Sequence, residues 1–147
     1  GVIYVGGQTD LEQKELYDRV DDAVCAVRSA LEEGIVAGGG VALFNESANL
    51  DHSTVAQHIL KEALSAPINQ IIVNAGLDPD EITGGGLVTG DYGYNVKSGV
   101  YGDMYEMGVI DPLKVTKSAL QNAVSVAVTI LSTNAIITMA RTYEDGE

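Results

Sequence analysis

Apolar residues recur at helical spacing over most of the chain, most clearly near its start. The positions concerned are Leu16, Val20, Ala23, Val24, Val27 and Leu31. Steps of three and four residues predict one amphipathic helix that ends near Glu33. Thr9 and Glu12 form a capping-box pattern at its start, and Gly34 is a typical residue just past a helix end. We expect the apolar stripe of this helix to be buried.

Two more helices are predicted between the end of this first helix and residue 74. The first covers about residues 39–50. The second begins with Ser53 as its cap and continues to about Asn74. Pro67 lies inside this second run, and a proline removes a backbone hydrogen bond from a helix interior. We therefore expect a kink or a break at Pro67.

Asp–Pro pairs mark two further helix starts. Asp78 precedes Pro79, and Asp111 precedes Pro112, so each pair places an N-cap before a proline at the first helical position. The second of these helices runs into residues 118–140, where there is no charged residue. Polar residues are spread through that stretch, whereas a membrane-spanning helix needs a more uniformly apolar run. We expect a helix within a helical domain and no membrane partner.

Short strands are predicted at the two ends of the chain and in one hairpin. Residues 2–5 (VIYV) and 135–140 (AIITMA) are rich in β-branched residues. Residues 92–95 and 100–101 are separated by a glycine-containing turn that is typical of a hairpin. The predicted fold class is therefore mainly α, with long helices, short β strands at the two chain ends and a small β-hairpin.

The composition excludes several classes of function. The chain has 147 residues, of which 46% are hydrophobic, and 21 acidic against 8 basic residues give a net charge of −13. A nucleic-acid or anionic-membrane surface needs clustered Lys and Arg, so neither partner is expected. Cys25 is the only cysteine, which indicates a reducing compartment and a small buried apolar role for this residue. His52 and His58 lack partners at ligand spacing, so no metal site is predicted.

The sequence places Gly38, Gly39 and Gly40 in a row directly before an apolar run that begins at Val41. Glycines at a helix N-terminus leave amide donors bare at the positive end of the helix dipole, which suits an anion or a nucleotide. A sharp turn between closely packed helices also explains them, and from the residues alone this explanation is favoured. Asp22, at the edge of the apolar stripe, is either a carboxylate that positions a water molecule or a solvated acid.

Three segments together resemble one protein family. They are RVDDAVCAVRSALEEGIVAGGGVAL (19–43), GDYGYNVKSGVYGDMYEMGVIDPLKVTKSALQNAVSVA (90–127) and the closing strand. They are similar to the C-terminal part of group I chaperonins, the GroEL type. The resemblance implies a three-domain subunit of an ATP-dependent ring that assists protein folding. Residues 1–33 would be the C-terminal segment of the intermediate domain, and residues 34–147 the C-terminal half of the equatorial, ATP-binding domain.

The resemblance also implies roles for individual residues. Gly38, Gly39 and Gly40 match the family glycines whose backbone lies against the nucleotide, and Gly39 matches the contacting residue. Asn95 and Val96 match positions at the adenine.

Further roles follow from the same resemblance. Val109 matches an apolar contact near the base, and Asp111 matches the carboxylate at the ribose. Asp22 matches the aspartate of the intermediate domain that swings down to orient the attacking water, which suits phosphoryl transfer. The phosphate loop and the Mg²⁺ ligands belong to the family's N-terminal half. We therefore expect no metal ligand among these residues, and an isolated chain that is inactive.

Because the chain opens with Gly rather than Met, we expect a piece of a longer protein. The resemblance implies a homo-oligomeric ring, with a cochaperonin and unfolded polypeptide bound through an apical domain. The implied location is the cytoplasm, or an organelle matrix in a eukaryote. The alternative is a non-enzymatic helical module that self-associates through its strand edges and binds no nucleotide.

Overall fold

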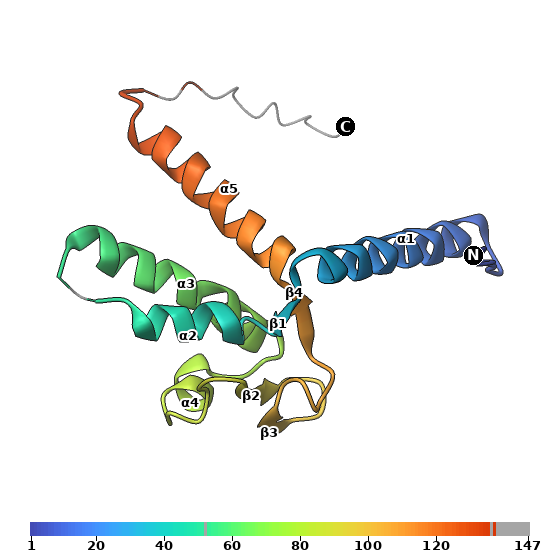
Figure 1. The fold of residues 1–147 in the computed structure, drawn as a ribbon, viewed down its shortest axis with the longest axis horizontal. Coiled ribbons are helices and arrows are strands. Elements are labelled where there is room, and N and C mark those ends of the chain that lie inside the picture. The colour runs from blue at the N-terminus through green and yellow to red at the C-terminus, as the bar shows by residue number, and fades with distance from the viewer. Residues whose placement is uncertain (52, 136, 138–147) are drawn as a thin grey trace, which may run out of the picture. The chain divides into compact units, whose positions relative to one another are not determined.

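The computed structural model describes residues 1–51, 53–135 and 137 of the chain (Figure 1). The chain divides into two compact units, Gly1–Thr116 and Lys117–Glu147. The elements in chain order are α1 (Asp10–Glu33), β1 (Ile35–Ala37), α2 (Val41–Asn49), α3 (Val55–Asn74), α4 (Pro79–Thr83), β2 (Tyr92–Asn95), β3 (Val100–Asp103), β4 (Ile110–Pro112) and α5 (Leu113–Leu131). The described chain is mainly helical with a few short strands, which confirms the predicted fold class.

Local signals set both ends of α1 as predicted. Thr9 is the N-cap, and its hydroxyl accepts a hydrogen bond from the Glu12 N–H (3.2 Å). The Glu12 carboxylate in turn accepts from the Gln8 N–H (2.7 Å). Gly34 ends the helix with φ +87°, a value that glycine adopts easily. These contacts satisfy backbone donors that a helix start would otherwise leave without partners.

The apolar stripe of α1 is not buried, which corrects the expectation for this helix. Leu31 is 83% exposed, and Cys25 is exposed as well, so the buried role predicted for Cys25 is wrong. The described chain reaches α1 near its C-terminal end, where the Leu113 N–H donates to the Gly34 carbonyl (3.1 Å). Periodicity predicts an apolar face, but burial also requires an element that covers it.

Of the two strands predicted at the chain ends, the structure describes one fully and the other only in part. Residues 2–5 form no strand, because no described segment pairs with them, and the prediction for them is wrong. The other strand, 135–140, lies largely outside the described residues. The predicted hairpin is confirmed: β2 and β3 are antiparallel, with Tyr92 opposite Asp103 and Asn95 opposite Val100.

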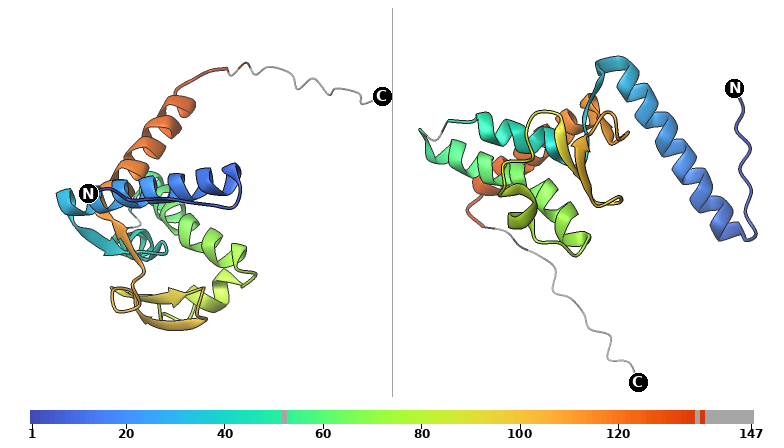
Figure 2. Two further views of the ribbon diagram at one scale, coloured as in Figure 1. Left: turned by 90° about the vertical axis from the view of Figure 1, so that its right-hand side faces the viewer. Right: turned by 90° about the horizontal axis from the view of Figure 1, so that it is seen from below.

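α2 and α3 pack side by side (Figures 1 and 2). The cap of α3 is Thr54 rather than the predicted Ser53, and it forms a full capping box with Gln57. α3 continues through Pro67 to Asn74, so the predicted break does not occur. Tertiary packing explains this continuity, because the buried residues of α3 lie on both sides of the proline and hold the helix against its neighbours.

A second two-stranded sheet joins distant parts of the chain. β1 and β4 are antiparallel, with Val36 opposite Asp111 and Ala37 opposite Ile110. The sequence predicts neither strand. Asp111 therefore lies in a strand and is not the N-cap of the following helix, which begins at Leu113. Pairing with β1 fixes an extended backbone at Asp111 and moves the helix start by one residue, from the predicted Pro112 to Leu113.

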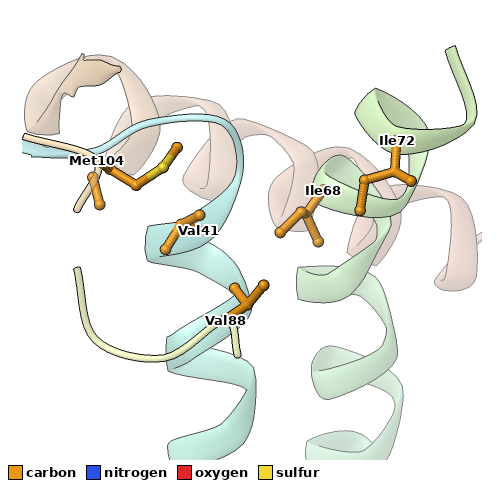
Figure 3. Packing of buried hydrophobic residues seen from close by; sticks show 6 residues of the cluster. Val41, Ile68, Ile72, Val88 and Met104 are labelled. Carbon is orange, nitrogen blue, oxygen red and sulfur yellow. The ribbon is translucent and has the colours of Figure 1, made fainter. Parts of the chain in front are cut away.

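The core lies where α2, α3 and the segments around the hairpin meet. It consists of Ala37, Val41, Ile68, Ile72, Val88 and Met104 (Figure 3). Among all the described residues, no helix is long and apolar enough to cross a membrane. Nor do three or more potential metal-binding side chains gather anywhere in the described ranges.

Candidate functional site

The glycine turn, defined as Gly38–Gly40, connects β1 to α2. Gly38 is buried, and its N–H donates to the Val109 carbonyl (2.9 Å). Its own carbonyl accepts from the Val41 N–H (3.2 Å). Gly39 and Gly40 have φ values of +66° and +81°, in the left-handed region that other residues rarely adopt. The turn therefore requires glycine for its backbone conformation at two of its three positions.

Close approach explains two of these glycines independently. A Cβ atom on Gly40 would lie 2.8 Å from the Ile68 nitrogen, and one on Gly38 would lie 3.0 Å from the Val109 carbonyl oxygen. Both neighbours are backbone atoms. A Cβ on Gly39 would instead meet the flexible end of Met104, at 3.1 Å from Cε. Tight packing, the explanation favoured by the residues alone, therefore accounts fully for Gly38 and Gly40 and less completely for Gly39.

The first turn of α2 follows directly from the glycine turn. Gly40 is the N-cap, and no side chain caps the helix. Amide groups in the first turn of a helix have no partner within the helix, and they attract anions together with the helix dipole. The glycine turn can therefore present backbone donors to a ligand without an intervening side chain.

β4 and the residue directly before it bring two more of the predicted residues to this place. The Val109 side chain lies beside Gly39, where Cγ1 would be 3.7 Å from a Cβ atom. Asp111 follows two residues later, opposite Val36 of β1. Partial burial raises the pKa of the Asp111 carboxyl above its usual range. Gly38, Gly39, Val109 and Asp111 thus belong to one continuous hydrogen-bonded region, although the two glycines are far in the sequence from Val109 and Asp111.

The hairpin carries Asn95 and Val96 at its turn. The Asn95 side-chain oxygen accepts from the backbone N–H groups of Lys97 (3.0 Å) and Ser98 (3.4 Å), so Asn95 organises this turn. Val96 is 37% exposed. The base of the hairpin packs on α2, because a Cβ on Gly93 would overlap Val41 Cγ2 at 2.6 Å. The hairpin is therefore anchored to the helix that begins at the glycine turn.

Asp22 lies apart from the residues already described. It is an exposed residue of α1, twelve positions before Gly34. At 1.5 Å per residue this is about 18 Å along the helix axis. The structure therefore does not bring Asp22 to the glycine turn, and its assignment as the residue that orients water stays a prediction.

Sequence reasoning missed two residues that shape this region. Gly93 admits the side chains of Val41 and Met104, and Met104 is fully buried between the hairpin and the glycine turn. Gly93 carries a weak signal, as a glycine inside a predicted strand marks close approach. Met104 carries none, because a single methionine in a glycine-rich segment has no periodic pattern.

Comparisons with known proteins agree with this architecture. The model of the TCP-1/cpn60 chaperonin family matches residues 1–141. Among solved structures, the chain is similar to a group III chaperonin in the open state, with 26% sequence identity and a TM-score of 0.78. The similarity covers 90% of this chain and 30% of that one, so the chain spans about a third of the length of the solved relative.

Proposed function

Because the chain belongs to the TCP-1/cpn60 chaperonin family, we propose that it supplies part of the ATP-binding site of a ring-forming chaperonin of the group I type. In this proposal residues 1–33 belong to the intermediate domain and residues 34–147 to the equatorial domain. The partners are neighbouring subunits of the same ring, and a cochaperonin and unfolded polypeptide bound elsewhere on the subunit. The cytoplasm or an organelle matrix is the proposed location.

The observation that carries the proposal is the convergence of backbone and side chains at Gly39. Gly39 carries no side chain that would cover its backbone, and no side chain caps the start of α2, which follows directly in the sequence. The apolar side chain of Val109 lies next to Gly39. Asp111, two residues beyond Val109, would accept hydrogen bonds from ribose hydroxyl groups. These groups suit the base and sugar side of ATP, with Asn95 and Val96 assigned to the adenine.

The phosphate and metal side of the site is proposed to lie outside this chain. A nucleoside triphosphate is held chiefly through charge on its phosphates and through Mg²⁺ bound to them. The described residues offer no group of three potential metal ligands. We therefore expect the chain alone to bind ATP weakly or not at all, and to hydrolyse none.

Asp22 is proposed to orient the attacking water when α1 moves toward the nucleotide in the complete protein. The experiment compares Asp22→Ala with Asp21→Ala, its neighbour about 100° around the helix. Single-turnover hydrolysis should fall roughly 10²–10⁴-fold for Asp22→Ala, the usual effect of losing a group that moves or positions protons. ATP affinity should stay nearly unchanged, because the proposed binding residues lie on other elements.

The neighbouring variant is the control. Asp21→Ala should change hydrolysis little, since Asp21 is a second exposed acid on the same helix. Equal and modest effects of the two substitutions would contradict the role of Asp22. Loss of ATP binding in Asp22→Ala would contradict it as well.

A second candidate function is a self-associating helical module that binds no nucleotide. It is favoured by the exposed apolar side chains of two helices: Leu31 of α1 is 83% exposed and Leu131 of α5 is 84% exposed. Such surfaces commonly mark protein–protein contacts. Sedimentation of the chain at increasing concentration, together with calorimetric titration of the complete protein with ATP, separates the two functions. Association without any ATP binding would favour the module.

A further inference from the structure

We propose that Met104 is a positioning residue that fixes the glycine turn and the β2–β3 hairpin relative to each other. The inference rests on the proposed function, because these two segments carry the groups assigned to the nucleotide. Met104 lies just beyond β3, and none of its side chain is exposed to solvent. Its buried thioether is not itself assigned to the nucleotide, so its effect would be transmitted through the segments that it packs against and bonds to.

The thioether end of Met104 lies against glycines of two separate segments. A Cβ on Gly39 would be 3.1 Å from Met104 Cε, and a Cβ on Gly93 would be 3.0 Å from Sδ. Gly93 precedes Asn95 by two residues in β2. In Figure 3 the Met104 side chain lies beside Val41 at the start of α2. One side chain therefore fills the space between the hairpin and the glycine turn.

The backbone of Met104 connects the same segments. Its N–H donates to the Asp91 carbonyl at the start of the hairpin (2.9 Å). Its carbonyl accepts from the Val109 N–H (2.8 Å), and the Val109 carbonyl accepts from the Gly38 N–H (2.9 Å). A shift of Met104 would thus reach the hairpin on one side and the glycine turn on the other.

Packing alone does not distinguish Met104 from its neighbours in the core, but these contacts do. Ile72 belongs to the same buried cluster and is 1% exposed. It lies in α3, and it is not among the atoms nearest to Gly39 or Gly93. Ile72 therefore provides a matched control, a buried side chain of similar size that is not among the atoms nearest to either glycine.

The experiment measures ATP affinity by calorimetry and thermal unfolding by scanning, in the complete chaperonin chain that contains these residues. Met104→Ala and Ile72→Ala should lower the Tm by similar amounts, because each removes a buried side chain of similar size. Only Met104→Ala should weaken ATP binding further, by about 10-fold, the order expected when binding groups lose their alignment. Met104→Leu, which nearly conserves volume, should restore affinity to within about twofold of the wild type.

Met104→Val is included as a milder variant, because it removes Sδ and Cε while keeping a buried apolar group. It should weaken ATP binding in the same direction as Met104→Ala. ATP affinities that are equal for the Met104 and Ile72 variants would overturn the positioning role and leave Met104 an ordinary core residue. Failure of the wild-type protein to bind ATP would instead overturn the proposed function, and the inference with it.

Discussion

Gly40 is the position in the glycine turn where one added methyl group should have the largest effect. Its φ is +81°, and a Cβ there would lie 2.8 Å from the Ile68 nitrogen and 2.9 Å from the Ile68 Cα. Both atoms belong to the backbone of α3, which cannot rotate away as a flexible side chain can. Gly40→Ala must therefore strain its own backbone and displace α2 from α3.

The magnitude follows from two separate costs. A left-handed conformation costs a non-glycine residue about 1–2 kcal/mol. An extra carbon forced into a well-packed region typically costs about 1–3 kcal/mol. We therefore expect Gly40→Ala to lower the free energy of unfolding by about 2–5 kcal/mol, a large part of the ~5–15 kcal/mol that stabilises a typical domain.

Gly76→Ala is the matched control. Gly76 has nearly the same φ, +78°, but no atom lies within 4 Å of a Cβ built there. Its substitution should therefore cost only the conformational part, about 1–2 kcal/mol. Urea unfolding of both variants, followed by far-ultraviolet circular dichroism, measures the difference. Equal losses of stability in the two variants would refute the role of the close approach between Gly40 and α3.

Three further predictions concern single interactions. Tyr101→Phe removes the hydrogen bond from the Tyr101 hydroxyl to the Ile82 carbonyl (3.0 Å) and should lower stability by about 0.5–1.5 kcal/mol in urea unfolding. Desolvation raises the pKa of Asp111 above 3.8, so ionisation of this carboxyl costs the folded state free energy, and stability falls as the pH rises through the folded-state pKa. Asp111→Asn should therefore be more stable than the wild type at neutral pH, and urea unfolding should show this advantage vanish as the pH falls below 3.8. The hydrogen bond from Lys114, and then its charge, lower the pKa of Glu32, so Lys114→Met should raise that pKa toward 4.5 in an NMR titration.

Local signals predicted the elements whose limits depend on nearby residues. Thr9 and Gly34 mark the two ends of α1, and the sequence predicts both because caps act within one helical turn. The hairpin was predictable because its two strands are neighbours in the chain. β1 and β4 were not, since three-residue strands show no periodicity and their pairing joins residues far apart in sequence. Asp111 shows the consequence, as its local pattern predicts a helix cap and its pairing with Val36 makes it part of a strand.

The candidate site divides in the same way. The glycine turn is visible in the sequence because three adjacent glycines are costly unless the backbone needs them. Its surroundings are not visible in the sequence, since Met104 reaches the turn, and Gly93 reaches Met104 and Val41, only through tertiary packing. The spacing of apolar residues in α1 predicts an apolar face, while the exposure of that face in the structure depends on which elements pack against it.

Hydrogen exchange of the complete protein, with and without ATP, tests the central claim most directly. The claim is that the glycine turn, the hairpin and β4 form one side of a nucleotide site. Peptides covering residues 34–43, 90–100 and 108–113 should gain protection together when ATP binds, because a ligand stabilises the segments that contact it. ATP binding that protects other segments and leaves these three unchanged would contradict the account.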